Sequence, residues 1–198
     1  MKHRDAQVTI IMGKNGTGKS TFAERIVTAM RRRAVVLTLN GAPKIWRPYE
    51  VIDPADPRSW DWQEGIRQVW YMQHEKETMR YLHRYFRDGV VVFDDCRGYL
   101  TSNVDSDQWL KRLLMDFRHK MLDLIFIAHA PTDVPPRLWG FYSTAFIGAT
   151  DALFPKSRIA TDSAERIIEA QQRVNASFRR AKGRGDGSHY GIFWMVGV

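Results

Sequence analysis

The chain has 198 residues, of which 30 are Lys or Arg and 22 are Asp or Glu, leaving a formal net charge of +8. This length is typical of one domain. Hydrophobic residues make up 44% of the chain and charged residues 26%, and this composition excludes an intrinsically disordered chain. Arginine accounts for 21 of the 30 cations, and its side chain can hold a phosphate with two bonds at once.

Two absences narrow the class of protein further. No apolar run reaches the ~18–20 residues that cross a bilayer, and the longest runs, around Val90–Phe93 and Leu122–Ala130, have the length of strands. The single cysteine, Cys96, cannot form an intrachain disulfide, which fits a reducing compartment. We therefore expect a soluble, cytoplasmic protein.

Short β-branched runs alternate with longer amphipathic stretches, which is typical of an α/β protein with a mostly parallel sheet flanked by helices. We expect one domain over residues 1–198 with about six strands and four principal helices. The predicted elements are, in chain order, a strand at Val8–Met12, a helix at Lys19–Met30, a strand at Ala34–Leu39, a helix at Gln63–Phe86, a strand at Val90–Phe93, a helix at Asp107–Met121, strands at Asp123–Ala128 and Thr144–Ile147, a basic helix at Ser163–Lys182 and a strand at Tyr190–Val196.

An irregular loop rich in Pro and Trp follows the second strand and contains Trp46, Trp60 and Trp62. Tryptophans mostly contribute to the core or to subunit contacts. These three are also candidates for stacking on adenine or on a neighbouring protomer.

The segment Gly13–Ser20 fits the phosphate-binding pattern G-x-x-x-x-G-K-[ST] without a mismatch, directly after an apolar strand and before a helix. Glycines let successive N–H groups point at phosphate oxygens, and the helix N-terminus adds a positive dipole. We expect Lys19 to reach the β- and γ-phosphates of ATP and Ser20 to give its hydroxyl to Mg²⁺. The predicted ATP-binding residues are Gly13, Lys14, Asn15, Gly16, Thr17, Gly18, Lys19, Ser20 and Thr21.

An acidic pair follows the apolar strand Val90–Phe93. A Mg²⁺–nucleotide site needs a carboxylate at the end of a neighbouring strand, and we expect Asp94 to hold Mg²⁺ and Asp95 to orient or deprotonate the attacking water. The later strand Asp123–Ala128 ends at His129. In ATPases of the additional-strand class this strand lies between the other two, and its tip carries a polar sensor of the γ-phosphate. His129 is a candidate for that role or for hydrogen-bonding the water.

The run Gly13–Ser20, the run Val90–Asp95 and the run Arg118–His129 together resemble the FtsK–HerA superfamily of DNA-pumping ATPases. Within it, the likeness is greatest to the packaging ATPases of tailless icosahedral viruses and to zonular-occludens-toxin-like assembly ATPases of filamentous phages. The resemblance covers about residues 7–150, which would form the nucleotide-binding core. It implies a RecA-like fold of the additional-strand class, ATP and Mg²⁺ as cofactors, DNA as a partner and assembly into a ring, commonly a hexamer.

The resemblance also implies an arginine that reaches the ATP of the next subunit. Arg118, before the sensor strand, is the first candidate for this finger, and Arg97, two residues beyond the acidic pair, is the second. Two departures from the family pattern concern the chemistry: Asp95 replaces the usual glutamate, and His129 stands where glutamine is common.

Residues 162–198 are expected to form a basic helix, a flexible Gly/Arg loop over Ala181–Ser188 and a last strand. Between Arg173 and Arg184 the chain has five cations and no acid, which suits sequence-independent contacts with DNA phosphates. A subunit interface that supplies a further finger, or a plain solvated surface, remain alternatives for this segment.

The function that these features favour is a DNA-translocating ATPase that packages a viral genome into a preformed capsid. It would act in the host cytoplasm, or associated with the virion at a packaging vertex, beside a portal-like partner. A toxin-like phage assembly ATPase is an alternative, although the sequence reaches Val198 without the transmembrane helix that such proteins carry. Two further alternatives are a small-molecule or nucleotide kinase, with Arg47 and Arg58 available for its substrate, and a nucleotide-switched binding module with negligible turnover.

Overall fold

The structure is a computed structural model that describes residues 5–39, 41, 43–99, 108–154, 163–185 and 187–197. Asp107 and residue 162, at which predicted segments begin, lie outside the described residues. The principal elements are β1 (Val8–Met12), α1 (Lys19–Met30), β2 (Arg33–Thr38), β3 (Glu50–Val51), β4 (Gly65–Trp70), α2 (Glu75–Tyr85), β5 (Gly89–Phe93), α3 (Gln108–Asp116), β6 (Leu122–Ala128), α4 (Pro136–Trp139), β7 (Thr144–Gly148), α5 (Ala164–Arg184) and β8 (Phe193–Gly197).

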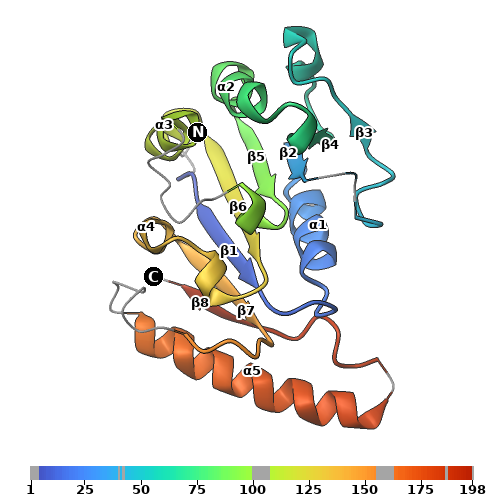
Figure 1. The fold of residues 1–198 in the computed structure, drawn as a ribbon, viewed down its shortest axis with the longest axis vertical. Helices are drawn as coiled ribbons and strands as arrows, with labels where there is room; N and C mark the ends of the chain where they lie inside the picture. The colour runs from blue at the N-terminus through green and yellow to red at the C-terminus, as the bar shows by residue number, and fades with distance from the viewer. Residues whose placement is uncertain are drawn as a thin grey trace.

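The described strands form one eight-stranded sheet in the order β3-β4-β2-β5-β6-β1-β7-β8. All neighbouring strands pair in parallel except β7 and β8, which are antiparallel (Figure 1). The predicted α/β class with a mostly parallel sheet is therefore confirmed. β6 lies between β1 and β5, as expected for the additional-strand arrangement.

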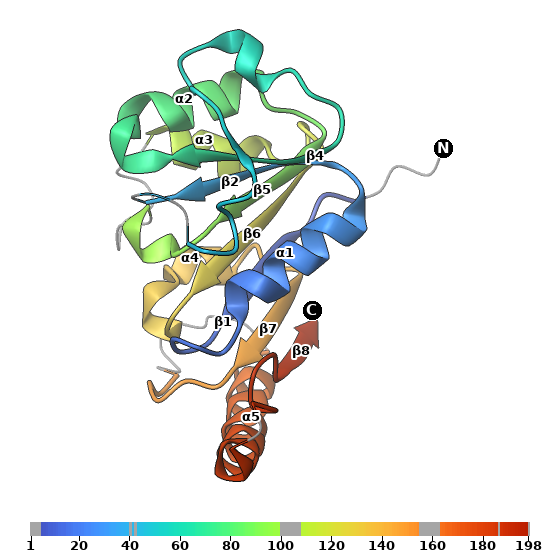
Figure 2. The same cartoon turned by 90° about the vertical axis from the view of Figure 1, so that its right-hand side faces the viewer.

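The sheet is a central layer with helices on both faces (Figure 2). One face packs against α2, α3 and α4, and its buried side chains include Ile10, Val91 and Phe126. The other face packs against α1 through side chains such as Ile11 and Val92. Because consecutive residues of a strand point to opposite faces, strands covered on both sides have to be apolar throughout, as β5 and β6 are.

The predicted helix Gln63–Phe86 is wrong in its first part. Gly65–Trp70 is the strand β4, which pairs in parallel with β2, and only Glu75–Tyr85 is helical. The apolar residues Ile66, Val69 and Trp70 fit a helical face, but β-branched and aromatic residues also favour strands. The open edge of β2 decides the outcome, because its backbone groups need a partner.

The predicted helix Asp107–Met121 is too long at its C-terminal end, because α3 ends at Asp116 and a turn leads from there to β6. Most other predicted boundaries are within a few residues. β1 and α1 have the predicted bounds. α5 extends to Arg184, so the first residues of the predicted flexible loop are the last turn of a helix, and the last strand starts at Phe193 rather than Tyr190. Among the described residues, the helices are too short or too polar to span a membrane.

Candidate nucleotide-binding site

The phosphate-binding loop connects the buried strand β1 to α1 at the carboxyl edge of the sheet. Gly18 precedes the first residue of α1 with φ of 85°, a backbone conformation that favours glycine. Within the described residues, no group accepts a hydrogen bond from the backbone N–H groups at positions 15, 16 and 18–21. Several donors at one helix N-terminus form a site for an anion.

The first part of the loop is anchored to the protein instead. The N–H of Gly13 donates to the carbonyl of Ala128 at 3.2 Å, and that of Lys14 donates to the carbonyl of Ala149 at 2.7 Å. The ammonium of Lys14 pairs with Asp151 at 2.9 Å and lies 5.1 Å from the ring of Phe178 on α5. In this conformation, therefore, the Lys14 side chain is engaged with the C-terminal part of the chain.

Lys19 is buried and extends across the loop. Its ammonium donates to the carbonyl of Lys14 at 3.1 Å and lies 3.2 Å from Nδ1 of His129. Burial lowers the pKa of Lys19 from its ordinary 10.5 to about 8, and the charges of Asp94, Asp95 and Asp133 oppose that shift. A bound polyphosphate would supply the negative charge that favours the protonated form.

Asp94 is a buried carboxylate held by two donors from distant parts of the chain. The hydroxyl of Ser20 donates to Oδ1 at 3.1 Å, and the indole N–H of Trp46 donates to Oδ2 at 2.6 Å. Burial raises the pKa of Asp94, the two hydrogen bonds lower it, and the charge of Asp95 adds to the rise. The carboxylate is thus fixed in place before any ligand binds.

Trp46 was a candidate for stacking on adenine, and the structure contradicts that interpretation. Trp46 is fully buried, and Trp60 and Trp62 are buried with only 2% and 7% of their surface exposed. The loop that carries Trp46 is held by the side-chain amide of Gln68 on β4, which donates to the carbonyls of Trp46 and Tyr49 at 3.1 and 2.6 Å. No local pattern near Trp46 marks Asp94 as its partner, because the two are 48 residues apart.

Asp95 lies beside His129 at the end of the neighbouring strand. Its Oδ2 is 3.6 Å from Nε2 of His129, while its buried Oδ1 has no hydrogen-bond partner among the described residues. The Lys19 ammonium can only donate, so a hydrogen bond between the two side chains requires Nδ1 of His129 as the acceptor, and the tautomer that allows it carries its ring proton on Nε2, toward Asp95. Lys19, His129 and Asp95 therefore form one connected polar cluster.

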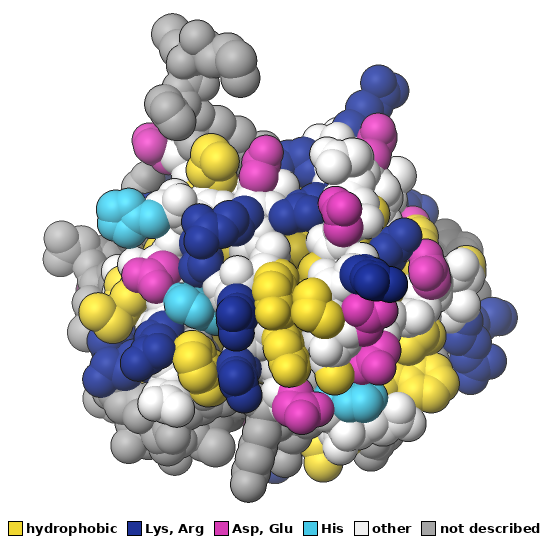
Figure 3. Space-filling view, turned by 90° about the horizontal axis from the view of Figure 1, so that it is seen from above, with side chains coloured by type: hydrophobic (Ala, Val, Ile, Leu, Met, Phe, Trp, Pro, Cys, Tyr) yellow, Lys and Arg dark blue, Asp and Glu magenta, His cyan; other side chains and the backbone are white. Residues whose placement is uncertain are grey.

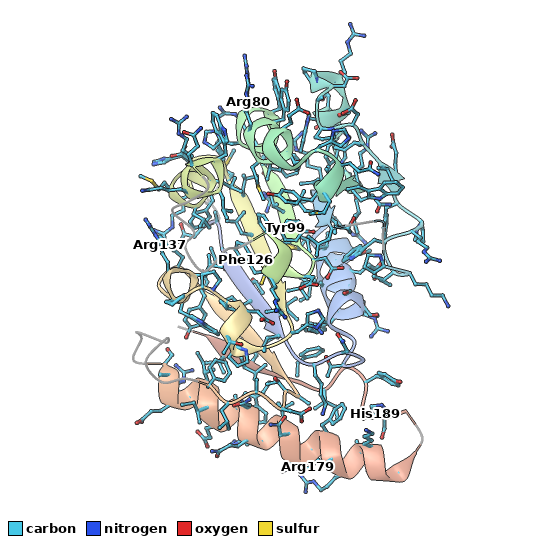
Figure 4. All side chains as sticks on the ribbon, viewed as in Figure 1. Arg80, Tyr99, Phe126, Arg137, Arg179 and His189 are labelled. Carbon is cyan, nitrogen blue, oxygen red and sulfur yellow. The ribbon has the colours of Figure 1, made fainter. Side chains whose placement is uncertain are left out.

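The backbone of Asp95 has φ of 60° and ψ of 67°, a left-handed conformation that Asp adopts more readily than most residues. Behind it, an aromatic layer holds the ends of β5 and β6. The rings of Phe93 and Phe126 stack at 4.6 Å, and Tyr99 packs edge-on to Phe93 at 6.0 Å (Figure 4). The acidic pair thus projects from a rigid part of the sheet.

Ser20 and Asp94 have the chemistry of a Mg²⁺ site. Mg²⁺ takes oxygen ligands and is commonly held by one or two protein groups together with phosphates and water. The Ser20 hydroxyl and the Asp94 carboxylate are adjacent and would hold the ion in this way. Among the described residues there is no cluster of three or more acidic, His or Cys ligands that would hold a metal without a nucleotide.

The two candidate fingers lie at opposite edges of the sheet. Arg97 is exposed in the short turn Cys96–Gly98, close to the acidic pair. Arg118 is exposed in the turn between α3 and β6. β6 has seven residues, and at ~3.3 Å per residue it separates Arg118 from His129 by about 20 Å. Within its own subunit Arg118 therefore does not reach the phosphate-binding loop.

The contacts between the phosphate-binding loop and the C-terminal segment leave no local signal in the sequence. Besides the Lys14 contacts, the N–H of Gly191 donates to the carbonyl of Thr17 at 3.0 Å. The rings of His189 and Tyr190 pack against each other just before it, with centroids 4.2 Å apart and planes tilted by 34°, and Tyr190 is 60% exposed. These residues are more than 130 positions away from the loop, and only the fold brings them together.

Comparison with known proteins supports the architecture. No protein-family model matches the chain, and no curated protein is similar to it in sequence. The solved genome-packaging NTPase B204 from Sulfolobus turreted icosahedral virus 2, in complex with AMPPCP, is similar at a TM-score of 0.64, with 13% identity over 85% of this chain and 86% of that one. The chain shares the fold of B204.

Two further structures are similar. B204 from Sulfolobus turreted icosahedral virus, described as a DNA-packaging ATPase, matches at a TM-score of 0.63 with 14% identity over 87% of this chain and 89% of that one. The N-terminal domain of zonular occludens toxin from Neisseria meningitidis matches at only 0.45, with 14% identity over 72% and 76% of the chains, which is too low to carry an argument. B204 has also been solved with ATP-γS and AMP.

The bond between Trp46 and Asp94 generates a test. In Trp46→Phe a buried carboxylate loses a donor while an aromatic ring is kept, so we expect a loss of about 2 kcal/mol in the free energy of unfolding. Trp60→Phe is the matched control, because the buried Trp60 indole donates to a neutral carbonyl, that of Pro54, at 3.0 Å, and its loss should cost about 1 kcal/mol. Urea denaturation measures both, and equal losses would show that the carboxylate bond adds nothing.

Proposed function

We propose that this chain is an ATP-hydrolysing motor that translocates DNA and packages a viral genome into a capsid. The observation that carries the proposal is the placement of Lys19, His129 and Asp95 in one polar cluster beside Ser20 and Asp94. The fold shared with the packaging NTPase B204 supports it.

In this proposal the triphosphate of ATP binds the free N–H groups of the loop. Phosphate oxygens then replace the carbonyl of Lys14 and Nδ1 of His129 as acceptors for the Lys19 ammonium. This frees His129 to face the γ-phosphate or the attacking water. Nucleotide binding is thereby coupled to a change at the residue beside Asp95.

Asp95 is the proposed base. Water attacks the γ-phosphorus, the bond to the β-phosphate oxygen breaks, and the proton of the water passes to the Asp95 carboxylate. The Asp95 side chain is 40% exposed, so a water molecule beside the γ-phosphate can reach its carboxylate. Mg²⁺, held by Ser20 and Asp94, would neutralise charge that develops on the β- and γ-phosphates.

The motor acts as a homo-oligomeric ring, with six subunits as in related motors, in the host cytoplasm or at a packaging vertex beside portal-like proteins. Its DNA contacts are sequence-independent and involve the cations between Arg173 and Arg184. Arg179, Arg180 and Lys182 are exposed on α5, and Figure 4 places Arg179 on the outer side of that helix. An exposed basic helix is suited to phosphate contacts.

The test is the ATPase rate with and without double-stranded DNA, together with the mass of the assembly. We expect DNA-stimulated hydrolysis by an oligomer. Transfer of the phosphoryl group to a small metabolite by a monomer, without effect of DNA, would favour a kinase. ATP binding with no stimulated turnover would favour a nucleotide-switched binding module.

Replacing Asp95 by Asn tests the assignment of the base. Asn also tolerates the left-handed backbone conformation, so the loop should keep its shape and ATP should bind as in the unchanged protein. Hydrolysis should fall by about 100-fold or more, since a general base contributes roughly that much. Single-turnover hydrolysis measures the effect, with Lys19→Ala as the inactive reference, and unchanged hydrolysis by Asp95→Asn would exclude the role.

Subunit mixing tests the finger. Arg118→Ala should be inactive alone, because a trans-acting arginine contributes roughly 10³–10⁵ in rate. Mixing Arg118→Ala subunits with Lys19→Ala subunits should restore hydrolysis. In the mixed ring, the intact phosphate-binding loop of an Arg118→Ala subunit lies beside the intact Arg118 of a Lys19→Ala neighbour. If the mixture stays inactive while the corresponding mixture with Arg97→Ala is active, Arg97 is the finger.

A further inference from the structure

A cavity of about 600 Å³ lies at the amino edge of the sheet, at the opposite end from the phosphate-binding loop. It is bounded by the second half of α2, the start of α3 and the turn before β6. Figure 3 views the molecule from this end and shows Lys and Arg side chains gathered there. The lining residues are Arg80, His83, Arg84, Arg87, Gln108, Trp109 and Lys120.

The positive charge of this basic cavity is not balanced by acids of the described residues. No described carboxylate lies within ion-pair distance of Arg80, Arg84 or Arg87. Two described acids lie near the cavity, and both are engaged elsewhere: Asp116 pairs with Nε2 of His83 at 2.9 Å, and Asp88 pairs with Arg32 at 2.9 Å. Several like charges around one cavity repel each other unless an anion enters it.

The crowding of charge is visible at Lys120, which is only 6% exposed. Its ammonium donates to the carbonyl of His83. Burial lowers the pKa of Lys120, and the positive charge of Arg87 lowers it further, while Asp116 opposes the shift. A cation held in place by a backbone carbonyl, with another cation beside it, is a prepared donor for an anionic group.

The arginines are held in position by aromatic rings. The guanidinium of Arg80 lies 5.6 Å from the ring of Tyr81, and that of Arg84 lies 5.3 Å from the ring of Tyr85. Arg80 and Arg84 are one helical turn apart, so their side chains project on the same side of α2. Cations in the last turn of a helix also complement its dipole, but this accounts for His83 and Arg84 and not for Arg80, Arg87 and Lys120.

We propose that the basic cavity binds phosphate groups, and that their source is the backbone of the DNA on which the motor acts. Arginine binds phosphate with two parallel hydrogen bonds, and the volume of the cavity is that of a site for a nucleotide-sized group. The assignment to DNA rests on the proposed function; a free nucleotide offers the same chemistry. The cavity would add a second basic contact, at the opposite end of the subunit from Arg179 (Figure 4).

The test compares two triple variants with the same loss of charge. The cavity variant is Arg80→Gln, Arg84→Gln and Arg87→Gln; the control is Arg25→Gln, Lys44→Gln and Arg166→Gln, three exposed cations elsewhere. Binding of a labelled duplex and of labelled oligothymidylate is measured between about 50 and 200 mM salt. ADP binding is measured in parallel by equilibrium dialysis.

We expect the cavity variant to bind duplex about 10-fold more weakly at the lowest salt, with the control within about twofold of the unchanged protein. The salt dependence of the affinity should weaken by about 2 to 3 units of log–log slope, since each lost phosphate contact removes about 0.9. Arg87 lies beyond the end of α2, so Arg87→Gln should not disturb that helix. This single variant should give about one third of the change in slope, and it replaces the triple variant if the latter does not fold.

Each other outcome is decisive. Loss of a second equivalent of bound ADP, with DNA binding unchanged, would identify a free nucleotide as the source of the phosphate. The proposal would be overturned if the cavity variant bound DNA as tightly as the unchanged protein does and also bound ADP as tightly. It would also be overturned if the variant changed only the mass of the assembly, because that result indicates a protein partner at the cavity. If the unchanged protein binds no DNA, the proposed function fails, and the ADP measurement still decides whether the cavity takes phosphate.

Discussion

The parallel pairing of β5, β6 and β1 is the constraint on which the candidate site depends. In a parallel sheet the carboxyl ends of neighbouring strands lie at one edge, and the register pairs Phe93 with Phe126 and Met12 with Ala128. The loop after β1, the acidic pair after β5 and the histidine after β6 therefore meet. Strands that are apolar on both faces keep this edge rigid.

Charge burial at that edge gives the site its electrostatic character. Lys19 and Asp94 are both buried, and burial disfavours the charged form of each, while hydrogen bonds and opposite charges favour it. Asp94 receives its donors from α1 and from the loop after β2. The position of the carboxylate thus depends on three separate segments of the chain, and Trp46 belongs to the site although it touches no solvent.

The two edges of the sheet differ in chemistry. The carboxyl edge combines free backbone donors with a lysine and two acids, which suits a Mg²⁺-bound polyphosphate. At the amino edge, the basic cavity and Arg118 present cations for which the described residues supply little compensating negative charge. In a ring, one edge of a subunit can serve its own nucleotide while the other faces neighbours or DNA, and the two proposals assign the edges in that way.

Much of this protein could be predicted from the sequence, because its strongest signals are local. The phosphate-binding loop, the acidic pair and the bounds of β1 and α1 depend on residues that are adjacent along the chain. Strand β4 could not be predicted, since Ile66, Val69 and Trp70 suit a helix as well as a strand, and only the unpaired edge of β2 decides between them.

Some features depend on contacts between segments far apart in sequence. These are the partners of Trp46, Lys14 and Thr17, and the gathering of Arg80, Arg87 and Lys120 around one cavity. Local pattern therefore determined which groups can bind a nucleotide, and tertiary packing alone decided which side chains fix them in place, because those contacts exist only when the sheet has formed.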